Sequence, residues 1–505
     1  MKKLVLFNLF LSMMLLTVSC KKEIKPTIEK TSSTELFSKS SPLESFVRIL
    51  SKAVSNETNL RHFIAKEALK EIDKDHDVFY NLVKDEIVDK NETLSDILTK
   101  YEEFPGQLLA IENEVPTLTI FVPTLPENSF SPKTWKPSDQ IPYVSSNYIK
   151  QNNYDMYLNG KLSFKMPADE APGFPVLVVK KNERIALKNN SVKLKSSIKN
   201  GYEWSDFEFI DDEFNGLIKS KGSTPWSGPI NIDQIVRDAY DLFKEDPNKW
   251  HRDYIYYGLK EPNDSGSIKK NFRETIQTFR LSKEALSIIS DQSEDPYFRG
   301  EGATTTLPLN TVNQIQPGAW TEGKFEFQFD ILINNLNGLG TSITRVKSIP
   351  PNELFYVAYE RVTRNNSEVI ITYRPSRNFA PSVYYINIPL INWDLQSNGI
   401  SWKIVVTEKD ASEVSSRKET ITSEFAKNFN LDTKIGLKFG ASSKEVKTNE
   451  FSITTTRTSD DLGSLEVHFW EPVLKAPIRS RDPLPSIHTV DNGLIEMAII
   501  PTKYY

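Results

Sequence analysis

The first part of the chain repeats its hydrophobic residues with a helical period. Between Pro42 and Glu103, apolar residues recur three and four positions apart, as on helices with one buried face. These residues are Leu43, Phe46, Val47, Leu50, Leu60, Phe63, Ile64, Ala68, Ile72, Phe79, Leu82, Val83, Ile87, Leu94, Ile97 and Leu98. Ser41 followed by Pro42 is typical of a helix start. The pattern predicts three or four short helices packed as a small helical bundle over residues 42–103.

The period changes to two in the next part of the chain, residues 104–200. Apolar and polar residues alternate at 118–122 and again at 154–158, and the second run ends in Asn159-Gly160. This dipeptide is a strong signal for a tight turn between two strands. Residues 176–179 form a short apolar run of the kind found in buried strands. We therefore expect a β-rich module here.

The rest of the chain divides into a mixed region and a second β-rich region. Residues 201–303 contain helical patterns at 230–243 and 271–289, separated by loops. Residues 304–505 contain short runs of strand-forming residues. These include Phe325, Phe327, Phe329, Phe355, Val357, Tyr359, Ile404, Val405, Val406, Ile435, Leu437 and Phe439. Successive short strands predict one or two β-sandwich domains. The expected fold class is α+β, with a C-terminal β-sandwich.

The N-terminus has the layout of an export signal. Lys2 and Lys3 precede an apolar run over residues 4–18, and Cys20, the only cysteine, follows at its end. A charged start, an apolar stretch and a small residue before the cleavage point are typical of a signal peptide, here residues 1–19. The cysteine at this place resembles the lipobox of bacterial lipoproteins, although Thr17 stands where that pattern prefers leucine.

The resemblance implies a lipid attachment at Cys20. In that family a diacylglyceryl group is joined to the thiol, the chain is cut before the cysteine, and the new N-terminus is acylated with a fatty acid such as palmitate. Two alternatives stay open: an ordinary cleaved signal with an incidental cysteine, and an uncleaved anchor. The apolar run is shorter than the ~20 residues that span a bilayer, which disfavours the anchor.

Residues 20–41 are expected to form a lipidated tether. They are rich in Ser, Thr and Lys and lack hydrophobic periodicity. Some lipoproteins of Bacteroidota carry an acidic signal after the cysteine that directs them to the outer face. Lys21-Lys22-Glu23 does not match it, which favours the periplasmic face of the outer membrane. The helical block, together with the sequence FPVLVVKKNERI at 174–185, resembles uncharacterised exported proteins of Bacteroidota, a resemblance that implies no known activity.

Composition limits the partners of the chain. Loss of Lys2 and Lys3 with the signal leaves 60 basic against 67 acidic residues in the mature protein. With this mild negative charge and no basic patch, nucleic acid is not an expected partner. An acylated Cys20 leaves no cysteine for a disulfide, so packed cores must stabilise the protein. The chain is 38% hydrophobic and 11% aromatic, as in globular proteins, and its length suggests roughly three domains.

Metal and cofactor motifs are not found in the sequence. The five histidines (His62, His76, His251, His468 and His488) stand singly, without the spacing that places two zinc ligands on one helix face. Asp73, Asp75 and Asp77 alternate as in half of a calcium loop, but Val78 and Lys84 occupy the positions of its glycine and its bidentate glutamate. We interpret these aspartates as residues that break and cap two helices. No metal or cofactor is expected.

One acidic cluster is the weak candidate for a ligand-binding site. It consists of Glu203, Trp204, Asp206, Glu208, Asp211 and Asp212, interleaved with Phe207 and Phe209. Carboxylates beside aromatic rings are what a sugar-binding or glycoside-cleaving site requires. The alternative is a solvated strand or helix edge with its aromatic residues facing inward. The sequence lacks a nucleophile elbow and a phosphate-binding glycine-rich loop, so catalysis has no support.

The function expected is that of a membrane-anchored cell-envelope lipoprotein that binds a partner without catalysis. Envelope glycans or proteins are the candidate ligands. The first alternative is an exported hydrolase of glycans or peptides that uses the acidic cluster. The second is a β-hairpin pore-forming or membrane-damaging protein, in which residues 434–458 supply two amphipathic strands.

Overall fold

The computed structural model describes most of the chain after the predicted tether. The described residues run from 40 to 504, except 189–196, 200–201, 205, 217–231, 246–249, 261, 263–265, 291–319, 335–339, 366–368, 395–397, 400, 410–414, 422–450, 458–459 and 478–484. The predicted signal, Cys20 and the tether up to residue 39 lie outside these residues. The described part forms one compact unit from Ser41 to Tyr505, with mixed α+β structure.

The N-terminal half of this unit is built on a six-stranded sheet. Its strands lie in the order β1 (Asp77–Phe79), β4 (Leu118–Phe121), β9 (Val176–Lys181), β5 (Tyr143–Ser146), β6 (Asn153–Leu158) and β7 (Lys161–Pro167). All pairs are antiparallel except β5 with β9. The predicted turn is confirmed: Asn159 and Gly160 connect β6 to β7 with φ values of 49° and 76°.

The predicted helices are present, but they do not form a separate bundle. They are α2 (Pro42–Asn56), α3 (Thr58–Ala68), α4 (Tyr80–Val83) and α5 (Leu94–Thr99); a further helix, α6 (Gln107–Glu114), lies in the segment predicted as the β-rich module. Ser41 caps α2 by accepting a hydrogen bond from the Glu44 amide at 3.2 Å, as the sequence predicted. Helix α2 packs against β5, β6 and β9, and β1 arises within the predicted helical block. Residues 42–103 and the β-rich module therefore share one sheet. The sequence did not predict β1, because a strand of three residues is too short to show a period.

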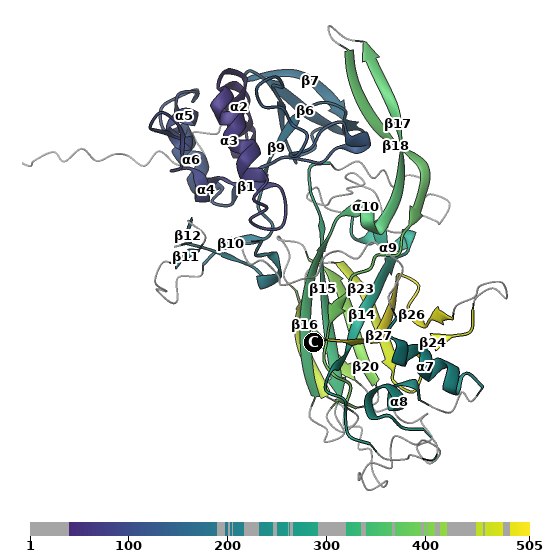
Figure 1. The fold of residues 1–505 in the computed structure, drawn as a ribbon. Coiled ribbons are helices and arrows are strands. Elements are labelled where there is room, and N and C mark those ends of the chain that lie inside the picture. The colour runs from purple at the N-terminus through teal and green to yellow at the C-terminus, as the bar shows by residue number, and fades with distance from the viewer. Residues whose placement is uncertain are drawn as a thin grey trace, which may run out of the picture. The chain divides into compact units, whose positions relative to one another are not determined.

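The C-terminal half contains two four-stranded sheets. In the first sheet the strands lie in the order β19 (Ile388–Pro389), β14 (Phe272–Leu281), β27 (Ile495–Lys503) and β26 (Thr489–Asp491). In the second sheet they lie in the order β16 (Gly340–Ile349), β15 (Phe325–Asn334), β20 (Ser401–Glu408) and β23 (Asp460–His468). Both sheets contribute to one hydrophobic core, in which the Phe279 and Phe327 rings lie 5.1 Å apart. Figure 1 shows these strands with α7 (Gln234–Phe243), α8 (His251–Tyr257) and α9 (Lys283–Ile288). The predicted strands around 325–329, 355–359 and 404–406 are confirmed.

The predicted helix over 271–289 is wrong for most of its length. Residues Phe272–Leu281 form β14, and only Lys283–Ile288 is helical. A β-bulge between Ile276 and Thr278 shifts the register against β27. The bulge brings Phe279 onto the same face as Phe272 and Ile276, since one extra residue restores the alternation. The resulting spacing of four and three residues is the spacing of a helix.

A long hairpin connects the two halves of the unit. Strands β17 (Phe355–Asn365) and β18 (Val369–Pro381) pair with each other, as Figure 1 shows, and β18 also pairs with β8 (Ala171–Pro172). The buried Glu170 accepts hydrogen bonds from Thr372 Oγ1 at 2.6 Å, from Arg374 Nη2 at 2.7 Å, and from Arg364. A Cβ at Gly173 would lie 2.8 Å from the carbonyl oxygen of Ile371, so this close approach requires glycine.

The remaining elements are short. They are β2 (Ile87–Asp89), β3 (Glu92–Thr93), β10 (Ile185–Leu187), β11 (Ser197–Lys199), β12 (Tyr202–Trp204), β13 (Phe207–Phe209), α10 (Pro351–Leu354), β21 (Ser415–Ile421), β22 (Phe451–Arg457), β24 (Leu474–Lys475), β25 (Ser486–Ile487) and two 3-10 helices, η1 (Pro126–Asn128) and η2 (Asp212–Phe214). Strand β22 pairs with β21, whereas residues 434–450 of the predicted insertion hairpin lie outside the described residues. Among the described residues, no helix is long and apolar enough to cross a membrane.

The shared core generates a stability prediction. Phe279 is fully buried, and its ring also lies 5.4 Å from Phe329. Phe279→Ala is expected to lower the free energy of unfolding by about 3–5 kcal/mol, because the cavity forms between two sheets. Tyr356→Ala, at a side chain that is 63% exposed, should change it by no more than about 0.5 kcal/mol. Urea unfolding of both variants tests this, and equal losses would contradict a common core.

Candidate functional site

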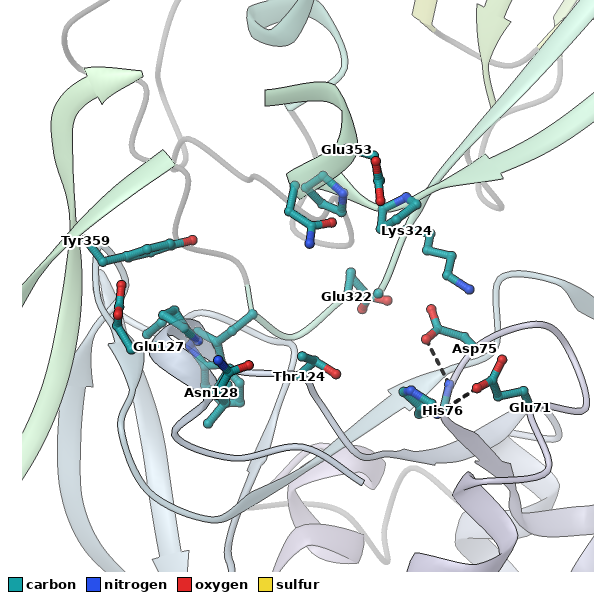
Figure 2. A pocket seen from close by; sticks show the side chains of 18 residues that line it. Glu71, Asp75, His76, Thr124, Glu127, Asn128, Glu322, Lys324, Glu353 and Tyr359 are labelled. Atoms are coloured by element: carbon teal, nitrogen blue, oxygen red, sulfur yellow. Dashed lines mark hydrogen bonds and ion pairs between the residues drawn. The ribbon is translucent and has the colours of Figure 1, made fainter. Parts of the chain in front are cut away.

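A cavity of about 600 Å³ lies beside the N-terminal sheet. Its walls come from five separate segments: the turn between α3 and β1, the loop with η1, strand β8, the segment before β15, and α10 with β17. The lining residues are Glu71, Asp75, His76, Thr124, Leu125, Pro126, Glu127, Asn128, Ala171, Trp320, Glu322, Gly323, Lys324, Pro350, Pro351, Asn352, Glu353 and Tyr359. In Figure 2, Glu71, Asp75 and His76 lie on one side and Tyr359 and Glu127 on the other. The lining is rich in carboxylates.

The floor of the cavity belongs to a buried ionic network centred on two cations. Lys180, at the end of β9, places its Nζ 2.7 Å from Glu322 Oε2, 3.0 Å from Glu183 Oε1 and 3.4 Å from Asp77 Oδ2. Strand β9 and the residues around the start of β1 contribute to the network from the N-terminal half of the chain. Glu322 contributes from the C-terminal half, just before β15. Asn147 donates to the other oxygen of Glu322 at 3.1 Å. The ammonium group therefore joins the two halves of the chain.

Arg184 makes the second junction, four residues after Lys180. Its Nε donates to Glu326 Oε1 at 2.7 Å, and its Nη1 lies 3.2 Å from Asp75 Oδ2. Asp73 does not contact a cation directly; it accepts hydrogen bonds from Asn182 at 2.8 Å and from the Asp75 amide at 3.2 Å. The side chains of Lys180 and Arg184 have no exposed surface. Each cation thus exchanges its hydration shell for carboxylates.

The network contains more acids than bases. Six carboxyl groups face the two buried cations: Asp73, Asp75, Asp77, Glu183, Glu322 and Glu326. Burial raises the pKa of Asp73 and Asp77, raises that of Glu322 to about 8, and raises that of Glu326 to about 7. Burial opposes ionisation of Asp75 and Glu183 too, but nearby lysine and arginine charges lower the pKa of both. The network thus contains four acids with a raised pKa and two with a lowered pKa.

Trp320 supplies a hydrogen-bond donor in the cavity wall. Its side chain is only 6% exposed, and its ring meets that of Tyr154 edge-on at 5.2 Å. The indole Nε1 has no hydrogen-bond partner among the residues that the structure describes. A buried N–H group without an acceptor is destabilising by about 1–3 kcal/mol. The Nε1 atom itself is enclosed by protein atoms.

The backbone at the rim of the cavity is strained. Glu127 and Asn128 are consecutive left-handed residues, with φ values of 55° and 54°, and Glu71 has φ 46°. A non-glycine residue in this conformation costs on the order of 1–3 kcal/mol, and such residues cluster at binding sites. All three residues line the cavity.

The aspartates 73, 75 and 77 do not cap helices, so that interpretation is wrong. Helix α3 ends at Ala68, and Asp77 opens β1. All three side chains are buried and serve the ionic network instead. The sequence could not show this, because their cationic partners lie about a hundred residues later in the chain. No group of three metal-binding side chains occurs in the described part of the chain.

The acidic cluster at 203–212 lies away from the cavity. Asp206, Glu208 and Asp212 are exposed, and Asp211 caps η2 by accepting from the Glu213 amide at 2.8 Å. Phe207 packs edge-on against Phe79, with ring centroids 4.9 Å apart. The backbone of Glu203 and Trp204 belongs to β12, which pairs with β11; their side chains are outside the description. The described acids face outward and the aromatic rings inward, and none of the residues of this cluster whose side chains are described lines the cavity.

The histidines do not converge on one centre. His62 is exposed and bonds Ser138, and only His76 lines the large cavity. Burial lowers the pKa of His251 and of His488 to about 4, so both are neutral at pH 7. His468 and His488 line a second cavity of about 20 Å³, which has room for roughly one water molecule.

Comparisons with known proteins return no relative for this chain. No protein-family model, no curated protein and no solved structure matches it.

The surplus of buried acids predicts stability that falls as pH rises. In the unfolded chain glutamates lose their protons near pH 4.5, whereas folded Glu322 and Glu326 keep theirs to about pH 8 and 7. Between these values the folded state binds more protons, so the free energy of unfolding should fall by about 1.4 kcal/mol per pH unit for each group. The lowered pKa of Asp75 and Glu183 adds stability that is lost only below this window.

The double variant Glu322→Gln, Glu326→Gln tests this assignment. An amide resembles the protonated acid but does not titrate, so the dependence of urea unfolding on pH from ~5 to ~8 should become shallower. Glu353→Gln, at an exposed glutamate on α10, is the matched control and should keep the wild-type slope. Stability that rises with pH in the wild type would contradict surplus protons in the network.

Proposed function

We propose that this chain is a lipid-anchored protein of the cell envelope that binds a polar ligand in the large cavity without transforming it. Acylated Cys20 holds the protein at the outer membrane, and residues 20–41 connect the anchor to the folded unit. In this proposal the two C-terminal sheets form a β-sandwich that carries one wall of the site. Envelope glycans are the ligand class that best fits the lining.

The observation that carries the proposal is a ligand-sized cavity whose polar lining comes from five separate segments of the chain. Ligand cavities commonly measure 300–1,000 Å³, and this one measures about 600 Å³.

The remaining lining supports a hydroxyl-rich ligand. Carboxylates at Glu71, Glu127 and Glu353 can accept hydrogen bonds, and Asn128 can donate them. Pro350, Pro351 and the half-buried Tyr359 ring offer apolar faces for the C–H groups of a sugar. A sugar ring presents both kinds of surface, since each hydroxyl group donates and accepts.

Trp320→Phe is the variant that tests ligand binding. It keeps an aromatic ring but removes part of the cavity wall, so the loss of contact area worth about 1 kcal/mol should weaken binding roughly fivefold. We would screen neutral and amino-sugar oligosaccharides by thermal shift and titrate the ligands found by calorimetry. Trp470→Phe, at a tryptophan outside this cavity, is the matched control and should bind as the wild type does.

A panel in which no oligosaccharide binds, or an affinity unchanged by Trp320→Phe, would sink the proposal. Product analysis of the same mixtures tests a second candidate function, an exported glycan hydrolase. That candidate is favoured by two acids that line one cavity with opposite pKa shifts, Glu322 raised and Asp75 lowered. Shortened oligosaccharides that disappear with Glu322→Gln would replace the binding proposal by the hydrolase.

The anchor is tested separately with Cys20→Ala. Natively expressed wild-type protein should carry an acyl mass in intact mass spectrometry and enter the detergent phase on partitioning, because two or more acyl chains give durable anchoring. The Cys20→Ala protein should carry no lipid and stay in the aqueous phase. Wild-type protein that is released without an acyl group would show that Cys20 is incidental.

A further inference from the structure

We infer that residues 320–324 form a proton-controlled latch, which closes on the N-terminal half while Glu322 is protonated and opens when Glu322 ionises. The latch supplies four residues to the wall of the large cavity: Trp320, Glu322, Gly323 and Lys324. Opening removes this wall, so one proton decides whether the cavity is formed. The inference goes beyond the proposed function, because it does not depend on the identity of the ligand.

The latch contacts the N-terminal half through polar groups. Glu322 Oε2 lies 2.7 Å from Lys180 Nζ, and the other oxygen of Glu322 accepts from Asn147 at 3.1 Å. Lys324 donates to the carbonyl oxygen of Lys74. The strength of such contacts depends on the charge of each partner, whereas apolar packing does not. A change of charge at Glu322 therefore acts directly on the contact that holds the latch.

The C-terminal end of the latch is fixed. Phe325 begins β15, is fully buried and belongs to the C-terminal hydrophobic core, and β15 is paired on both sides by β16 and β20. The hairpin of β17 and β18 joins the two halves separately, through Glu170 and its partners Thr372 and Arg374. Residues 320–324 can therefore move about Phe325 while both halves stay folded and connected.

Glu322 shares its cation with two other acids. Lys180 Nζ also lies 3.0 Å from Glu183 Oε1 and 3.4 Å from Asp77 Oδ2, so one ammonium group faces three carboxyl groups. Carboxylates held together repel one another, and a proton on one of them relieves the repulsion. The other charged groups of the network face different partners: Arg184 faces Glu326 and Asp75, Lys324 points toward Asp75 in Figure 2, and Asp73 accepts from Asn182.

The direction of the switch follows from the two environments of Glu322. In the closed latch, burial and the charge of Glu183 raise the pKa of Glu322 to about 8, although Lys180 opposes the shift. In the open latch, water solvates the carboxylate and its pKa returns toward the ordinary value of 4.5. The open form then binds fewer protons. Its population therefore rises with pH between these two values, by up to about tenfold per pH unit.

Thiol labelling at a buried position of the latch measures its opening. Thr321 has no exposed surface, so Thr321→Cys, made in the full chain with Cys20→Ala, reacts only when the latch opens. Its labelling rate, divided by that of a free thiol at the same pH, should rise at least about tenfold from pH ~6 to ~8. With Glu322→Gln added, this ratio should change by less than about threefold, because an amide does not titrate.

Two controls separate this opening from global unfolding. Glu326→Gln, at a buried acid that stays in place on β15, should keep the rise with pH. Ala285→Cys, at a fully buried position of the C-terminal core, should label more slowly than Thr321→Cys and respond more strongly to urea, because it reacts only after the core unfolds.

Three outcomes overturn the inference: a labelling ratio that does not change with pH, equal labelling of the two cysteine variants at every pH and urea concentration, or a rise with pH that survives Glu322→Gln. Circular dichroism shows whether each variant is folded. The first two outcomes require no change at Glu322, so they decide the matter even where Glu322→Gln does not fold.

Discussion

The contact between Lys180 and its carboxylates determines how the two halves of this chain can meet. A buried ammonium group is stable only with close anionic partners, and removal of one partner from such a pair typically costs about 3–5 kcal/mol. Lys180 takes Asp77 and Glu183 from its own half and Glu322 from the segment before β15. The position of that segment is therefore fixed by electrostatics as well as by packing.

This constraint also explains why a cavity exists at the junction. Apolar surfaces can close completely, whereas Asp75 and Glu322 keep polar atoms oriented toward the network and leave space above it. The same segment carries Trp320, whose ring packs on Tyr154 of β6 and forms part of the cavity wall. The hairpin then closes the far wall, because Glu170 binds Thr372 and Arg374 beside Ala171. The site follows from how the halves are joined.

The sequence predicted elements whose pattern is local. The start of α2 at Ser41 and the turn at Asn159-Gly160 depend on neighbouring residues, and both are confirmed. The strand β14 could not be recognised, because its bulge gives Phe272, Ile276 and Phe279 a helical spacing. The prediction of a separate helical bundle failed for a related reason. Whether a helix packs on other helices or on a sheet depends on residues that are distant in the sequence.

The sequence could not predict the cavity, because its lining residues are far apart along the chain. A search for residues that cluster along the chain instead selected the acidic residues at 203–212, where successive acids alternate toward solvent. The cavity instead collects single acids from distant segments, such as Glu71, Glu127 and Glu353, each unremarkable among its neighbours. One local signal did exist: Lys180 continues the apolar run at 176–179 within β9. A charge that is buried in such a strand must find partners inside the protein.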